Sequence, residues 1–247
     1  MGAAVFEVAY DGSHYFGSQL QPKLPTVQGE LEKAFSKICD GGKARIKLSG
    51  RTDRGVHATG QVIEVKGDLH PPLKVAAQIV NQRLDSSIRI RSFGEAVPAF
   101  DVRHWAAKRS YSYLLRPGGS DSPFLNPLSL AVEPSLDWPL MERGANVLQG
   151  RHNFISFATC PKEQNRLNRE LELLCFDFRH LPRWVVVEFR ARAFLRGQIR
   201  NMLGALLSLG RGQCTMEDLK RLLEAEEKRN VPKPAPPMGL YLRKVYY

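Results

Sequence analysis

The chain has 247 residues, of which 43% are hydrophobic and 25% are charged, so it is long enough to bury a core and has globular composition. Its 36 Lys and Arg outnumber its 25 Asp and Glu, and the net charge of +11 favours a polyanionic partner such as a nucleic acid. No apolar run reaches the ~18 residues of a membrane span, which excludes a helical membrane protein. The four cysteines form no C-x-x-C pair, which predicts reduced thiols in a cytoplasmic protein and no structural zinc site.

The first half of the chain mixes strand and helix patterns. Thr26 is a candidate N-cap for a helix with apolar residues at helical spacing, and Asp11-Gly12 is a turn signal. The patterns predict strands over 3–10, 44–49, 60–65 and 88–93, and helices over 26–39 and 72–84.

The second half repeats this mixture. We expect the helix from Arg196 to bury a full apolar stripe, and Thr215-x-x-Asp218 resembles a capping box. The patterns predict strands over 110–115, 171–178, 184–191 and 239–246, and helices over 138–149, 196–209 and 215–228. This irregular alternation predicts an α+β fold with mixed or antiparallel sheets, and a loose boundary near 98–108.

One segment, 49–58, concentrates charged groups between two predicted strands. Asp53 lies between Arg51 and Arg54, and Gly50 and Gly55 permit a tight turn. Nearby positive charge keeps a carboxylate ionised, which suits a nucleophile better than a general acid. A purely structural turn with Arg–Asp pairs explains the same residues, so both interpretations stay open at this point.

The segment Gly50–Ala58 resembles the G-R-T-D-x-G-V-H motif of the TruA family of tRNA pseudouridine synthases. Further matches follow in the family's order over nearly the whole chain. They are Tyr10–Ser13 with Tyr15, Phe16, Gly17 and Gln19; Thr26–Gln28; Phe100 with Arg103; Arg109–Tyr113; Gly150 with His152, Phe154 and Phe157; Phe194–Gly204; and Gly239–Leu242.

The resemblance implies an isomerase that converts uridine to pseudouridine in tRNA, with the anticodon stem-loop positions 38–40 as targets. Asp53 matches the family's catalytic aspartate, a nucleophile toward the base C6 or the ribose C1′. Tyr111 matches a base-stacking tyrosine, and Arg200 an arginine that pairs with the aspartate. We expect Arg51 and Arg54 to bind RNA phosphate or the flipped nucleotide. No cofactor and no metal are expected, since the reaction involves no net redox or phosphoryl chemistry.

The resemblance also implies the architecture: two ferredoxin-like (RRM-like) halves whose mainly antiparallel sheets join, with a central active-site cleft. We expect an N-terminal half, 1–104, with the Asp loop, and a C-terminal half, 105–247, with the tyrosine, the arginine helix and most of the basic surface. Residues 151–247 carry 18 basic against 10 acidic side chains. The family typically forms homodimers, which makes a second copy and tRNA the expected partners, without a membrane.

The chain departs from the bacterial pattern at Ser18 and Leu20, where a Trp and an Arg are usual, at Arg54, where Ala is usual, and at Asp101. We expect these changes to affect the choice of RNA and not the chemical core. The alternatives are a non-catalytic RNA-binding protein of the same fold and a synthase acting on another RNA. A metal-dependent nuclease would need clustered carboxylates or histidines, which a single Asp does not supply.

Overall fold

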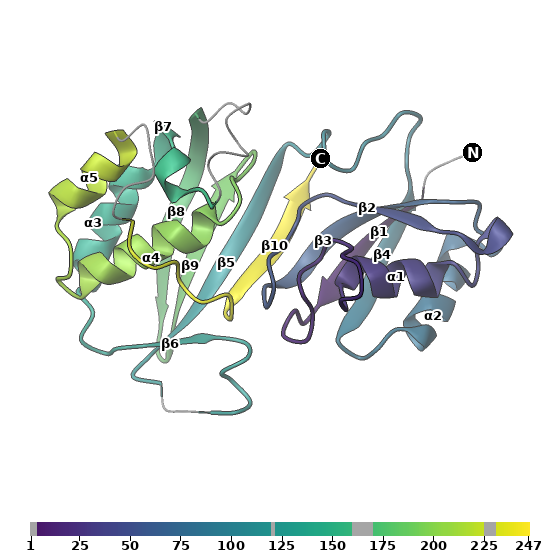
Figure 1. The fold of residues 1–247 in the computed structure, drawn as a ribbon, viewed down its shortest axis with the longest axis horizontal. Helices are drawn as coiled ribbons and strands as arrows, with labels where there is room; N and C mark the ends of the chain where they lie inside the picture. Colours follow the sequence, from purple (N-terminus) through teal and green to yellow (C-terminus); the bar gives the residue numbers. More distant parts are fainter. Residues whose placement is uncertain (1–3, 120–121, 160–169, 225–230) are drawn as a thin grey trace. The chain divides into compact units, whose positions relative to one another are not determined.

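A computed structural model describes residues 4–119, 122–159, 170–224 and 231–247. The chain divides into two compact units: Met1–Ala107 together with Leu240–Tyr247, and Lys108–Gly239. Each unit combines a mainly antiparallel sheet with helices, so the predicted α+β class is confirmed (Figure 1). Within the described residues, no helix has the length and apolar character needed to cross a membrane.

The first unit is a sheet with two helices, α1 and α2. β1 pairs antiparallel with both β3 and β4, β2 pairs antiparallel with the end of β3, and β10 pairs in parallel with its start. The elements are β1 (Ala4–Tyr10), α1 (Val27–Phe35), β2 (Arg45–Leu48), β3 (His57–Lys66), α2 (Leu73–Arg83), β4 (Ile88–Glu95) and β10 (Leu240–Tyr246), with a short 3-10 helix at Asp40–Gly42.

The core of this unit follows from the alternation along β1. Every second residue of β1 is buried, and Phe6 lies 5.0 Å from Phe35 between ring centroids. α1 begins where predicted, because the side chain of Thr26 accepts a hydrogen bond from the Gly29 N–H at 3.2 Å. The helix ends at Phe35, four residues before the predicted end.

The second unit is a sheet in the order β5-β9-β8-β7, with all of these pairs antiparallel and β6 parallel to β5. Its elements are β5 (Lys108–Pro117), β6 (Leu130–Val132), α3 (Trp138–Leu148), β7 (Gly150–Asn153), β8 (Glu170–Leu181), β9 (Trp184–Ala191), α4 (Gln198–Gly210) and α5 (Met216–Glu224), with a 3-10 helix at Ile155–Phe157. In Figure 1, α3 and α4 pass across the ribbon of this sheet.

α4 forms the core of the second unit. Almost all of its residues are buried, including the predicted stripe, which contains Met202 and Leu206. α5 begins at the predicted capping box: Thr215 N–H donates to the Asp218 carboxylate at 2.9 Å, and Asp218 N–H donates to Thr215 Oγ1 at 3.2 Å.

Three further features differ from the predicted elements, and other predicted features lie outside the described residues. Arg196 precedes α4, because Gly197 has φ 74° and cannot continue a helix. β6 and β7 were not predicted, since each is only three or four residues long. The predicted end of α5 and the basic residues of 162–169 lie outside the described residues. Finally, β10 belongs to the first unit, whereas the expected halves placed 105–247 together, because this strand returns to pair with β3.

Candidate active site

Asp53 sits on a tight turn between β2 and β3. The Val56 N–H donates to the Asp53 carbonyl at 3.1 Å, and Gly55 has φ 77°, which confirms the predicted need for glycine there. Asp53 is half-buried, while its neighbours Arg51 and Arg54 are exposed. The turn therefore places a half-buried carboxylate between two arginines whose side chains are accessible to solvent and to a polyanion.

A buried amide holds the start of this turn. Gln61 is fully buried on β3; its Nε2 donates to the Gly50 carbonyl at 2.7 Å, and its Oε1 accepts from the Gly50 N–H at 3.3 Å. Gly50 has no positive φ, so this position is held by a hydrogen-bonded pair and not by unusual backbone geometry. The sequence analysis did not single out Gln61, although a polar residue inside a buried strand must find hydrogen-bond partners.

Thr52, the residue before Asp53, is hydrogen-bonded to a side chain of β1. The hydroxyl groups of Tyr10 and Thr52 form a hydrogen bond of 2.9 Å, and Gln61 Nε2 donates to Tyr10 Oη at 3.4 Å. Burial raises the pKa of Tyr10, although these hydrogen bonds oppose the shift. The tyrosine stays a neutral hydrogen-bonding group, so it ties the turn to the sheet.

The loop after β1 packs against the other side of the turn. A Cβ placed on Gly12 would lie 2.1 Å from the Val56 carbonyl oxygen, so only glycine permits this approach. The Gly12 N–H donates to Nδ1 of the buried His57 at 3.2 Å, and this ring stacks on Tyr241 with centroids 4.6 Å apart. His57 is thus a structural residue that joins the loop, the start of β3 and β10.

Asp11, in the same loop as Gly12, also lies against His57. Burial acts to raise the pKa of its carboxyl, but hydrogen bonds from the Ser13 hydroxyl and N–H, with smaller contributions from His57 and His14, lower it. Its Oδ1 lies 3.1 Å from His57 Nδ1. The carboxylate is therefore held as an anion at the back of the Asp53 turn.

Two departures from the family pattern contact the turn directly. Ser18 is fully buried: its N–H donates to the Thr52 carbonyl at 3.0 Å, and its Oγ accepts from the Thr52 N–H at 2.8 Å. The Arg54 guanidinium lies 4.3 Å from the centroid of the Phe16 ring. Ser18 thus contacts the residue before Asp53, and this contact was not predicted from the sequence.

The other two departures lie apart from these contacts. Asp101 forms an ion pair with Lys47, and its Oδ2 lies 3.0 Å from His104 Nδ1. The hydrogen bond from Lys47, which outweighs the effect of burial, holds the pKa of Asp101 well below its usual range. Leu20 is exposed and its N–H donates to Gln28 Oε1 at 2.9 Å.

The second unit carries the two other predicted site residues. Tyr111 on β5 is buried and meets the Phe194 ring edge-on, with centroids 5.3 Å apart. Arg200 on α4 is half-buried; its Nε donates to the Ala235 carbonyl at 2.8 Å, and its own carbonyl accepts from the Ala235 N–H at 2.8 Å. Arg200 thus fastens the proline-rich segment 231–237 to α4.

Tyr113, two residues along β5 from Tyr111, also contacts this segment. Its hydroxyl donates to the Pro236 carbonyl, and burial raises the pKa of Tyr113 far above its usual value, although the charge of Arg200 opposes the shift. Tyr113 is therefore a structural tyrosine that carries no negative charge at neutral pH.

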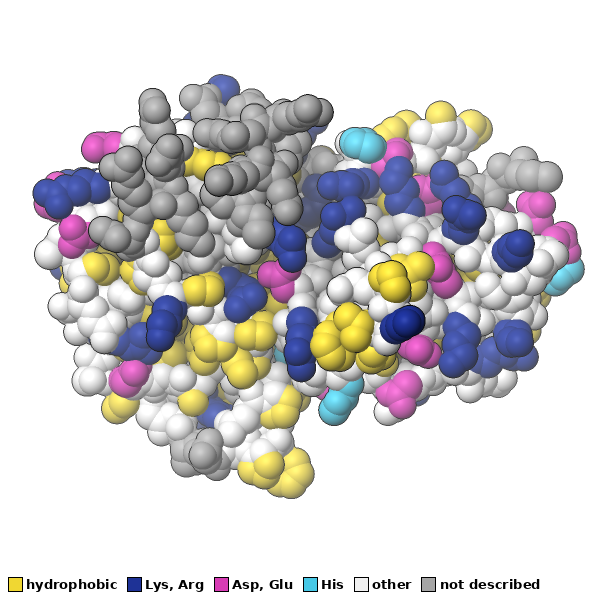
Figure 2. All heavy atoms as spheres, viewed as in Figure 1, with side chains coloured by type: hydrophobic (Ala, Val, Ile, Leu, Met, Phe, Trp, Pro, Cys, Tyr) yellow, Lys and Arg dark blue, Asp and Glu magenta, His cyan; other side chains and the backbone are white. Residues whose placement is uncertain are grey.

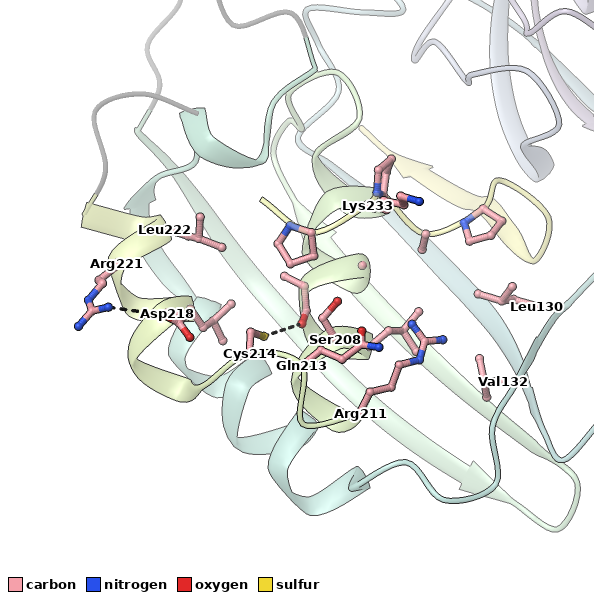
Figure 3. Close-up of a pocket in the computed structure, with 18 of the residues that line it drawn as sticks. Leu130, Val132, Ser208, Arg211, Gln213, Cys214, Asp218, Arg221, Leu222 and Lys233 are labelled. Carbon is pink, nitrogen blue, oxygen red and sulfur yellow. Dashed lines mark hydrogen bonds and ion pairs between the residues drawn. The ribbon is translucent and has the colours of Figure 1, made fainter. Parts of the chain in front are cut away.

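A cavity of about 1050 Å³ opens between α4, α5 and the proline-rich segment (Figure 3). Three of its charged lining residues form ion pairs: Arg221 pairs with Asp218 at 3.4 Å, and Arg211 pairs with Glu133 at 2.9 Å. None of the five predicted site residues is among its described lining residues, so its position does not bear on the chemistry of Asp53.

The described residues contain no group of three or more His, Cys, Asp or Glu placed to hold a metal ion. Figure 2 shows Lys and Arg side chains spread over much of the visible face, with fewer carboxylates between them. Such a surface attracts the phosphates of a nucleic acid without reading its sequence.

The chain thus combines a half-buried carboxylate on a hydrogen-bonded turn, two exposed arginines beside it, and a basic surface of the kind that attracts polyanions (Figure 2). A family model described as "tRNA pseudouridine synthase" matches residues 7–104 and 145–247. The chain belongs to the tRNA pseudouridine synthase family.

Curated relatives extend this match to nearly the full chain. The chain is 34% identical over 241 residues to "tRNA pseudouridine synthase A" of Listeria welshimeri, covering 97% of both proteins. It is 33% identical over 240 residues to the protein of that name from Geobacillus sp., covering 97% of this chain and 96% of the relative. It is 35% identical over 242 residues to that of Chloroflexus aurantiacus, covering 97% and 87%.

Proposed function

We propose that this protein is an isomerase that converts uridine to pseudouridine in tRNA, with the anticodon stem-loop positions 38–40 as its targets and Asp53 as its nucleophile. The observation that carries the proposal is the hydrogen-bonded turn: residues just before Asp53 are held by β1, β3 and the loop after β1, while Asp53 itself is half-buried. A carboxylate held in this way is positioned before the substrate arrives.

The reaction balances within the substrate. The Asp53 carboxylate attacks the base at C6, or the ribose at C1′, and the N1–C1′ bond breaks. The uracil turns so that C5 faces C1′, and a C5–C1′ bond forms. On the C1′ route the bond to Asp53 breaks as the C5–C1′ bond forms, and on the C6 route it breaks as C5 loses its proton. On both routes C5 gives up its proton and N1 ends protonated. No atom or electron is gained or lost overall, so the carboxylate is regenerated after each turnover.

The remaining site residues act on the RNA. The target uridine must leave its stack to reach Asp53, and Tyr111 offers an aromatic surface for the flipped base. Arg51 and Arg54, both exposed, bind phosphates around that nucleotide. Arg200 is assigned to substrate binding together with them, as a cation that keeps the reacting carboxylate ionised.

The strand order of the first unit supports a ferredoxin-like half, because β1 lies between β3 and β4 in a β-α-β-β-α-β chain order. We extend the same proposal to the second half and to a homodimer acting in the cytoplasm, where tRNA is modified. Light scattering during size-exclusion chromatography tests the dimer: a mass of one chain across micromolar concentrations refutes it.

The direct test is release of tritium from tRNA labelled with [5-³H]uridine, in buffer containing EDTA. Wild type should release tritium, and Asp53→Asn, which keeps the size of the side chain, should not. Asp40→Asn, which alters an exposed carboxylate of the same unit, is the matched control and should behave as wild type. Wild type that binds tRNA without release favours the non-catalytic RNA-binding protein.

The position of modification is tested with tRNA transcripts that carry cytidine at 38, 39 and 40. Loss of tritium release from these transcripts supports the anticodon stem-loop. Unchanged release shows that the enzyme acts elsewhere on the tRNA, and would leave the role of Asp53 intact.

A further inference from the structure

The segment Phe16-Gly17-Ser18 holds the residues on both sides of Asp53. Ser18 makes two hydrogen bonds to Thr52, and the Phe16 ring lies under the Arg54 guanidinium. Between them, Gly17 has φ 96°, and a Cβ there would lie 2.9 Å from the Thr52 carbonyl oxygen. Because Gly17 has no side chain, the segment can pack directly against the backbone of the turn.

Ser18 is the central contact of this segment. Its Oγ accepts from the Thr52 N–H, and its own N–H donates to the Thr52 carbonyl. Ser18 therefore hydrogen-bonds to both backbone polar groups of Thr52. Its own carbonyl accepts from the Gln28 N–H at 2.9 Å, in the first turn of α1. Ser18 thus connects the residue before Asp53 to the start of a capped helix, which is a rigid support.

We propose that Ser18 is a positioning residue that sets the orientation of the Asp53 carboxylate through the Thr52 backbone. Thr52 is buried, so the loss of Ser18 Oγ leaves its N–H without that acceptor. The Arg51–Thr52 peptide then gains freedom to rotate, and the shift passes through the Thr52 backbone to the next residue, Asp53. This inference rests on the proposed role of Asp53 as nucleophile.

Ser18→Ala removes the hydroxyl that accepts from the Thr52 N–H and that also hydrogen-bonds Tyr10, and it keeps the backbone bond from the Ser18 N–H to the Thr52 carbonyl. Ser36→Ala is the matched control: Ser36 Oγ also accepts a backbone hydrogen bond, from the Ala44 N–H at 3.0 Å, but it lies at the end of α1. The measurements are the single-turnover rate of pseudouridine formation at saturating tRNA, the Kd for tRNA, and the melting temperature.

We expect Ser18→Ala to lower the single-turnover rate roughly 10- to 100-fold, as a displacement of about 1 Å does at a reacting group, while the Kd stays within about twofold. Ser36→Ala should keep the wild-type rate. Ser18→Cys, which keeps a weaker acceptor of similar size, should give an intermediate rate. Equal rates for Ser18→Ala and Ser36→Ala, or a loss confined to the Kd, overturn the proposal.

Hydrogen exchange of the Thr52 amide provides a readout that does not depend on activity. The amide should be protected in wild type and exchange faster in Ser18→Ala, whereas Ser36→Ala should leave it protected. A Thr52 amide that exchanges freely in wild type refutes the positioning role even if the protein is active. Conversely, a protected amide in a wild type that makes no pseudouridine refutes the proposed function and not the contact.

Discussion

Replacing Gly12 by alanine tests how closely the loop after β1 must approach the Asp53 turn. The new Cβ would lie 2.1 Å from the Val56 carbonyl oxygen and 2.7 Å from its carbonyl carbon. Both atoms belong to backbone, so no side chain can rotate away to make room. Gly12 has no positive φ, which means that the contact, and not backbone strain, causes the effect.

The size of the effect follows from this geometry. An ordinary contact between heavy atoms needs about 3.5 Å, so loop and turn must separate by up to about 1.4 Å. Overpacking of this kind costs about 1–3 kcal/mol, and loss of the hydrogen bond from the Gly12 N–H to His57 adds about 1 kcal/mol. For a chain of this length, we expect the melting temperature to fall by about 5 to 15 °C.

Activity should fall as well, because Val56 closes the turn with its hydrogen bond to the Asp53 carbonyl. A shift of about 1 Å there predicts a single-turnover rate lower by roughly 100-fold, measured below the melting temperature of the variant. Two variants serve as controls. Gly94→Ala places its Cβ in open space and should match wild type. Gly60→Ala meets the Arg243 carbonyl at 2.3 Å and should lower stability with a smaller loss of rate.

A melting temperature within about 1 °C of wild type for Gly12→Ala would contradict the predicted clash, since it would show that loop and turn separate at no cost. The reasoning about activity fails separately if Gly12→Ala is destabilised but retains the wild-type rate. In that case the turn keeps Asp53 in place without the support of this loop.

Two further predictions concern groups near the turn. Arg54→Gln should reduce the slope of log K for tRNA binding against log salt by about 1 while most of the turnover is kept, and an unchanged slope would show that Arg54 contacts no phosphate. Tyr241→Phe tests a pH effect on stability. Burial, with a smaller contribution from the Asp11 charge, raises the pKa of Tyr241 to about 12. The folded state therefore keeps the phenol proton, which the unfolded state loses from about pH 10. Stability in urea should therefore fall between about pH 10 and 12 more steeply in wild type than in Tyr241→Phe, and parallel curves would contradict the assignment.

Local patterns were sufficient to predict most helices and strands and to single out the segment around Asp53. Thr26 and the Thr215–Asp218 pair cap their helices as expected, since a cap involves residues only three apart. Asp53 stands out because two glycines and two arginines surround it within a few residues. These features depend on short-range spacing and turn chemistry, so they can be recognised in the sequence before the structure is known.

Contacts between distant residues decided the remainder. Ser18 and Thr52 are 34 positions apart, and Gly12 and His57 are 45 apart, so nothing in either segment alone shows that they meet. The same reason explains why the contact of Ser18 with Thr52 and the pairing of β10 with β3 were not predicted. Hydrophobic periodicity indicates which face of a helix or strand is buried. The hydrogen-bond partner of a buried N–H or carbonyl is set by the tertiary fold, which brings distant segments together.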